Sequence, residues 1–151
     1  MDLCELALAA EKIAREAGAE IKRIYDAGKF ESFIKDDQSP VTSADYAAND
    51  IICAALRELT PDIPILSEES NEDEIAQRRS WPRFWLIDPL DGTGEFVAGS
   101  GDFAVAIALI DNHQPIIGVI YAPIHDRSYI ASKGKGAFRR DSDGLSPIDR
   151  K

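Results

Sequence analysis

The stretch 88–93, which reads DPLDGT, holds the residues best suited to chemistry in this chain. The ring of Pro89 fixes its own φ angle and removes an N–H group, so we expect a sharp turn at this point. Such a turn would aim the carboxylates of Asp88 and Asp91 and the carbonyl of Leu90 at one point. Oxygen ligands without His or Cys select a hard cation. The motif therefore predicts a Mg²⁺ site in which two ions share Asp88.

The two residues that follow complete a site for a phosphate. Gly92 permits close backbone approach, and free N–H groups at the start of a short helix expected from Thr93 would receive a phosphate oxygen. If Asp45 accepts its proton, the Thr93 hydroxyl would line up a water for in-line attack on phosphorus. The metals would stabilise the entering and leaving oxygens. This chemistry is the hydrolysis of a phosphate monoester.

Further acids stand at the ends of expected elements. Asp45 lies in the first turn of a helix, and Glu68 and Glu69 follow an apolar strand over 63–66. If that strand neighbours the one before Asp88, Glu68 and Asp88 would lie side by side, which like-charge repulsion forbids unless cations sit between them. Each signal alone fits a solvated turn, a surface pair or an ordinary helix start. Their order along the chain favours one shared site.

Hydrophobic periodicity predicts the elements that must position these acids. One amphipathic helix is expected over 2–26 with Gly28 as its stop, and a second begins with Thr42 or Ser43 as N-cap and ends before Pro61. Short strands are expected over 29–35, 63–66, 84–87, 102–110, 115–121, 128–131 and 137–139, with a hairpin loop over 112–114 and a polar insertion over 71–79. Helices followed by a run of strands predict an α+β fold, with two long helices on a mostly antiparallel sheet.

Composition limits the class of protein. With 151 residues, of which 44% are hydrophobic, the chain can fill one core, and we expect one domain over 1–140 and a disordered polar tail over 141–151. The formal net charge of -10 argues against a nucleic-acid polymer or an anionic membrane as the main partner. No stretch is long enough to span a bilayer and the start lacks a signal-peptide pattern, so the expected location is the cytoplasm.

The cysteines and histidines offer no competing mechanism. Cys4 and Cys53 lie in Ala-rich, helix-like surroundings without a CxxC pattern, and we interpret both as buried thiols. His113 and His125 stand in expected loops without a Ser or Cys nucleophile in a recognisable elbow, and we interpret both as surface residues.

Taken together, these motifs resemble the lithium-sensitive, Mg²⁺-dependent phosphatase superfamily, which includes inositol monophosphatase, fructose-1,6-bisphosphatase and 3'(2'),5'-bisphosphate nucleotidase. The resemblance rests on LSEES at 66–70 and DPLDGT at 88–93, and it covers nearly the whole chain up to about Arg140. Within the superfamily, SPVTSAD at 39–45 and GVIYAP at 118–123 look most like the bacterial CysQ type of nucleotidase. The resemblance implies a sugar-phosphatase-like fold and removal of the 3'-phosphate from adenosine 3',5'-bisphosphate, a by-product of sulfate assimilation, to give AMP.

The resemblance also implies a role for each matching residue. Glu68, Asp88 and the Leu90 carbonyl would hold the first Mg²⁺, and Asp88 and Asp91 the second. Asp45 and Thr93 would activate the water, and Asp45 would also reach a third ion through water. The backbone N–H groups of Gly92 and Thr93 would contact the phosphate. Glu69 would lie outside the ligand shell.

Two departures from the family pattern keep alternatives open. Gly94 stands where the CysQ type usually has a lysine, so inositol monophosphate competes as the substrate. The chain also stops at Lys151, before the second α/β domain that supplies the WD aspartate in the family. A catalytically impaired metal-binding fragment is therefore the second alternative. An uncovered sheet face would favour self-association, and loose attachment to the inner membrane face is known of similar enzymes.

Overall fold

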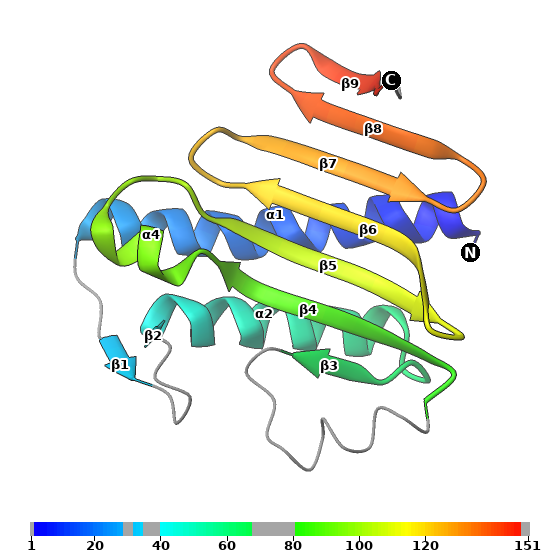
Figure 1. Cartoon of the computed structure of the whole chain (residues 1–151), viewed down its shortest axis with the longest axis horizontal. Helices are drawn as coiled ribbons and strands as arrows, with labels where there is room; N and C mark the ends of the chain where they lie inside the picture. The colour runs from blue at the N-terminus through cyan, green and yellow to red at the C-terminus, as the bar shows by residue number, and fades with distance from the viewer. Residues whose placement is uncertain (1, 29–31, 35–39, 68–80, 149–151) are drawn as a thin grey trace.

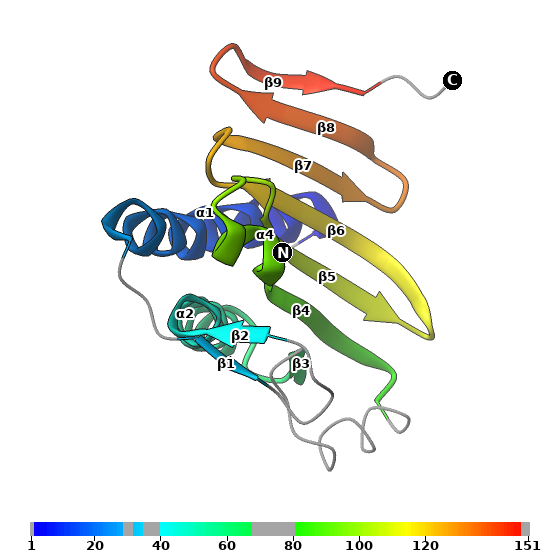
Figure 2. The same cartoon turned by 60° about the vertical axis from the view of Figure 1, so that its left-hand side comes forward.

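The computed structural model describes residues 2–28, 32–34, 40–67 and 81–148. In this part of the chain, two long helices lie on one face of a seven-stranded sheet, as Figures 1 and 2 show. The elements in chain order are α1 (Leu3–Ala27), β1 (Ser32–Ile34), β2 (Pro40–Thr42), α2 (Ser43–Leu59), β3 (Ile65–Ser67), β4 (Arg83–Asp91), α4 (Thr93–Ala98), β5 (Ala104–Asp111), β6 (Gln114–Ala122), β7 (Arg127–Ser132), β8 (Gly136–Asp141) and β9 (Gly144–Pro147). Strands β1 and β2 form a separate antiparallel pair.

Local capping signals set the ends of the two long helices. The side chain of Asp2 accepts from the Glu5 N–H at 2.8 Å to start α1, and Gly28 ends it in the left-handed region at φ 67°. Thr42 is the N-cap of α2, and Thr60 follows its last turn. Both predicted helices are therefore confirmed. Their ends could be predicted because each cap lies within a few residues of the turn that it stabilises.

The seven strands run in the order β3-β4-β5-β6-β7-β8-β9. Only the β3–β4 pair among the described strands is parallel, and each later neighbour pairs antiparallel. The β5–β6 hairpin turns at Asn112 and His113, whose φ angles of 49° and 68° suit the tight turns that match the twist of two strands. The predicted α+β class and the mostly antiparallel sheet are confirmed.

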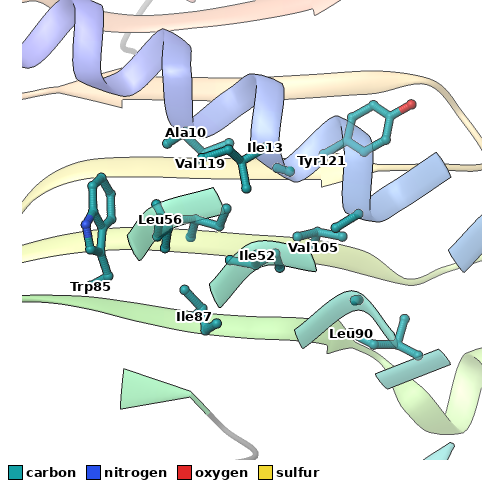
Figure 3. Packing of buried hydrophobic residues seen from close by; sticks show 14 of the residues in the cluster. Ala10, Ile13, Ile52, Leu56, Trp85, Ile87, Leu90, Val105, Val119 and Tyr121 are labelled. Atoms are coloured by element: carbon teal, nitrogen blue, oxygen red, sulfur yellow. The ribbon is translucent and has the colours of Figure 1, made fainter. Parts of the chain in front are cut away.

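Alternation along the strands separates the core from the opposite sheet face. Helix α1 packs on β5, β6 and β7, and α2 packs on β3 and β4. On β5, Val105, Ile107 and Leu109 point to this helical layer and are buried. Figure 3 shows Ile52 and Leu56 of α2 between Ile87 of β4 and Val105 of β5 and the residues of α1. The burial of both helices on one face fixes where the N-terminus of α2 meets the sheet.

The helix-free face of the sheet is also apolar. A groove of about 410 Å³ runs over it, lined by Ala106, Ala108 and Gly118 among others. Ile120 and Tyr129 stand opposite each other on β6 and β7 and remain 48% and 37% exposed. The expectation of an uncovered apolar face agrees with this surface, while self-association stays a prediction. Among the described helices, none is both long enough and apolar enough to cross a membrane.

Two sequence predictions need correction. The tail over 141–151 was expected to be disordered, but Gly144–Pro147 forms β9 and pairs with β8. This pairing uses backbone groups, so it needs few apolar side chains; Leu145 stays 45% exposed. The sharp turn expected at 88–91 is also wrong, since β4 continues through it as a strand. The strand predicted over 29–35 is described only at Ser32–Ile34, and the insertion over 71–79 lies outside the described residues.

Candidate active site

The start of α2 holds a buried carboxylate in a fixed orientation. Asp45 is only 2% exposed. Its Oδ2 accepts from the backbone N–H of Thr42 at 2.9 Å and from the Thr42 hydroxyl at 2.6 Å, which completes a capping box with the Thr42 side chain. These bonds join one carboxylate oxygen to the N-cap residue. The other oxygen, Oδ1, is left to face the end of β4.

Thr93 meets that second oxygen across 48 positions of sequence. The Thr93 hydroxyl donates to Asp45 Oδ1 at 2.8 Å and also lies 3.2 Å from the Leu90 carbonyl oxygen. Thr93 opens α4, whose N-cap is Gly92. The structure thus brings together Asp45 and Thr93, the pair that sequence reasoning joined, with the Leu90 carbonyl beside them.

Gly92 is needed where the chain leaves β4. Its φ of 92° lies in the region that glycine adopts readily. A Cβ at this position would also lie 2.9 Å from the backbone carbonyl oxygen of Asp102. Because that neighbour is backbone, it has little freedom to give way. The close contact between this turn and the 99–103 loop therefore fixes the position of Thr93.

A β-bulge aligns the two acids of the motif. Asp88 lies opposite Ala106 on β5, whereas Asp91 lies opposite Ala104, so three steps along β4 match two along β5. Residues two apart on a strand share a face, and so do direct cross-strand partners. Asp88 and Asp91 therefore rise on the same sheet face, which an unbroken strand would not allow. Pro89 lies inside the bulge, the kind of position in a sheet that tolerates a residue without an N–H.

The donor set in this corner suits magnesium. Asp88, Asp91 and the Leu90 carbonyl all offer oxygen, the ligand type that Mg²⁺ prefers. The described residues hold no group of three His, Cys, Asp or Glu side chains close enough to bind an ion. Glu68 and Glu69 lie outside the described residues. Their proposed parts as metal ligand and neighbouring acid therefore stay predictions.

Sequence reasoning missed one polar contact near this corner. The Ser67 hydroxyl donates to Asn49 Oδ1 at 2.5 Å, and the Cys53 thiol lies 3.7 Å from the same oxygen. The spacing of Asp45 and Asn49, one helical turn apart, was the available signal. Its partner on β3 could not be read from that spacing. As predicted, Cys53 is buried, whereas Cys4 is only half-buried.

A shallow hollow of about 290 Å³ adjoins the motif. Asp91, Gly92, Asp102 and His125 lie along it. His125 and Asp102 are both exposed. The prediction that His125 lies at the surface is therefore confirmed. No pattern in the sequence indicates that this histidine lines the same hollow as the second acid of DPLD. The β6–β7 loop brings it there.

Comparison with known proteins identifies the family. The model of the inositol monophosphatase family matches residues 2–149. The chain belongs to this family. It is 51% identical to the 3'(2'),5'-bisphosphate nucleotidase CysQ of Escherichia coli O157:H7 over 125 residues, which cover 82% of the chain and 50% of that protein. The chain thus spans about half the length of the curated relatives that it matches.

Solved structures of the family share this fold. The crystal structure of CysQ from Bacteroides thetaiotaomicron superposes with a TM-score of 0.78 at 42% identity, covering 97% of this chain and 52% of that one. The extragenic suppressor protein SuhB from Bartonella henselae gives a TM-score of 0.81 at 31% identity, covering 97% of this chain and 55% of that one. The fold predicted from the resemblance is confirmed by both.

Proposed function

We propose that this chain forms the metal-holding part of a Mg²⁺-dependent phosphate monoester hydrolase of the inositol monophosphatase family. We propose further that its substrate is a 3'(2'),5'-bisphosphate nucleotide such as adenosine 3',5'-bisphosphate. The observation that carries the reaction is the hydrogen bond from the Thr93 hydroxyl to buried Asp45, at the end of a strand that bears two aligned acids. The identity to CysQ nucleotidases supports the substrate.

The proposed roles start from the orientation of Thr93. Because its proton points to Asp45 Oδ1, the lone pairs of its oxygen are available to accept a hydrogen bond from a water. The water would then donate one proton towards Thr93 and direct a lone pair at phosphorus. Asp45 can take up a proton through the same hydroxyl as the water attacks. Two fixed bonds from Thr42 keep the Asp45 carboxylate from turning away.

The acids and amides around this pair would hold the substrate. Asp88, Asp91, the Leu90 carbonyl and Glu68 are the proposed ligands of two Mg²⁺ ions, with a third ion reached from Asp45 through water. When bound, Mg²⁺ neutralises phosphate oxygens and stabilises charge on the leaving group. The backbone N–H groups of Gly92 and Thr93 are the proposed phosphate contacts. Gly92, the N-cap of α4, has no side chain that could bond the first N–H groups of that helix. The proposed compartment is the cytoplasm.

Release of inorganic phosphate by the 151-residue chain tests this proposal. Adenosine 3',5'-bisphosphate and inositol 1-phosphate are offered in parallel, with and without Mg²⁺, to the wild-type chain, to Asp91→Asn and to Asp102→Asn. Asp102 is the matched control, because it is an exposed acid on the same hollow with no proposed metal. We expect Mg²⁺-dependent release from the nucleotide, suppressed by lithium, lost in Asp91→Asn and kept in Asp102→Asn.

Each other outcome decides against a part of the proposal. Faster release from inositol 1-phosphate would overturn the nucleotide substrate and favour an inositol monophosphatase, in line with Gly94 in place of the usual lysine. No phosphate release from either substrate, with Mg²⁺ binding intact, would show a metal-binding fragment that lacks activity by itself. No phosphate release together with no Mg²⁺ binding would overturn the proposed function altogether.

A further inference from the structure

Strand β3 is a short element with one neighbour in the sheet. It has three residues, Ile65–Ser67, and pairs only with β4 among the described strands. Its last residue, Ser67, lies opposite Ile87 in a parallel register. In the sequence, the next residues after these two are Glu68 and Asp88, two of the proposed metal ligands. The end of β3 therefore leads in the sequence into one proposed ligand, and the position opposite it on β4 leads into another.

A three-residue edge strand frays easily unless side chains add to its backbone pairing. The start of β3 is held near Trp85, whose backbone N–H donates to the Pro64 carbonyl at 2.8 Å and whose ring N–H donates to Thr60 Oγ1 at 2.9 Å. The end of β3 is held by the 2.5 Å bond from Ser67 to Asn49. The end of β3 is thus bonded directly to α2, whereas near its start Thr60, just after α2, bonds Trp85 of the neighbouring β4.

We propose that Asn49 is a positioning residue that sets the magnesium affinity of the site by fixing Ser67, and with it the end of β3. The inference rests on the proposed magnesium-dependent function. Asn49 follows Asp45 by one turn of α2, so one face of the helix reaches both acidic strand ends: Asp45 binds Thr93 after β4, and Asn49 binds Ser67 on β3. Residues that orient metal ligands without touching the ion commonly change its affinity.

Packing alone does not account for an amide at this position. Ala48, Ile52 and Cys53 beside it on α2 are buried, and asparagine is a poorer helix former than leucine. Asn49 itself is half-buried, and an apolar side chain would serve a purely structural contact there without an amide whose hydrogen bonds must be kept. Asn49 instead accepts from Ser67, which is only 6% exposed. The polar contact between Asn49 and Ser67 thus lies at the last residue of β3, directly before Glu68 and Glu69 in the sequence.

Mg²⁺ binding measured by titration calorimetry tests the inference without relying on turnover. The variants are Asn49→Leu and Ser67→Ala, each of which removes one side of the bond, their double mutant, and Ser67→Thr, which keeps the hydroxyl. We expect each single variant to lose about 10-fold in Mg²⁺ affinity, as outer residues around metal ligands typically do. The double mutant should be no weaker than the single ones, because they remove the same bond. Ser67→Thr should bind as the wild type does.

Thr60→Val is the matched control for a merely structural role. It removes the bond to Trp85 of β4, opposite the start of β3, so it should lower the free energy of unfolding and leave Mg²⁺ affinity unchanged. Equal affinity in wild type, Asn49→Leu and Ser67→Ala would overturn the inference while leaving the proposed function intact. The same loss of affinity in Thr60→Val would also overturn it. Absence of Mg²⁺ binding by the wild-type chain would contradict the proposed function, and the inference with it.

Discussion

Two buried carboxylates on the two long helices differ in what surrounds them. Asp45 on α2 is 2% exposed and Glu11 on α1 is 3% exposed. Glu11 accepts from the Arg140 guanidinium at 2.7 Å, and Arg15 lies 3.9 Å away. Asp45 receives only neutral donors, from Thr42 and Thr93, and none of the ion pairs found in the described part of the chain includes it.

This difference separates a structural carboxylate from one suited to chemistry. A buried charge is costly unless a partner compensates for it. The charge on Glu11 is matched within the fold by a residue 129 positions away, which ties β8 to α1. The Asp45 carboxylate receives only neutral hydrogen-bond donors, so its charge stays available to a cation that arrives with the substrate. The two helices therefore carry different roles despite similar burial.

Exchanging the Asp45 carboxylate for an amide should have the largest effect on activity. In Asp45→Asn the acceptor for the Thr93 proton becomes weaker and loses its charge, so we expect phosphate release to fall by about 10²- to 10⁴-fold. Asp50→Asn makes the same change at an exposed site on α2 and should leave the rate unchanged. Steady-state rates at saturating Mg²⁺ provide the measurement. A variant as active as the wild type would show that Asp45 only caps the helix.

The same exchange at Glu11 should act on stability instead. Glu11→Gln leaves Arg140 without its charged partner, and we expect a loss of about 1–3 kcal/mol in the free energy of unfolding. This range lies below the full cost for a buried pair, because the Arg140 side chain is 33% exposed and regains water. Urea unfolding measures the change, with exposed Glu16→Gln on the same helix as control. Reduced phosphate release without lost stability would contradict the assignment.

Sequence reasoning found the elements and the pair that the fold brings together. Helix ends could be predicted because Asp2, Gly28 and Thr42 act on backbone groups close to them in the sequence. The Asp45–Thr93 contact could be predicted because each residue begins a helix beside a strand end. These signals are local, and a resemblance in the motifs joined them across the chain.

The features that sequence reasoning missed depend on strand partners. The bulge that aligns Asp88 with Asp91 exists only in relation to the register of β5. The β9 strand depends on backbone pairing with β8, to which the polarity of its side chains is a poor guide. The bond between Asn49 and Ser67 joins positions 18 apart, and no periodicity of α2 indicates which strand lies next to it. Each needs the arrangement of the whole sheet.

The smallest expected effect lies at Tyr121, which packs so closely on Gly18 of α1 that a Cβ there would lie 2.5 Å from the ring. Burial, followed by the 2.7 Å bond from its hydroxyl to Asp126, raises the pKa of Tyr121 to about 12. The protonated form is thus favoured in the folded state. Its contribution to stability is fully present below the ordinary tyrosine pKa of about 10 and is lost as the pH rises through about 12.

Tyr121→Phe removes this hydroxyl and keeps the ring. We expect the phenolate absorbance that develops near pH 12 to disappear, and the free energy of unfolding at neutral pH to fall by about 0.5–1 kcal/mol. The loss is small because the Asp126 side chain is 70% exposed and finds water instead. Mg²⁺ affinity should not change, since this hydroxyl bonds Asp126 and none of the proposed metal ligands. A change in affinity would show that the surroundings of the two buried carboxylates are coupled through α1 and α2.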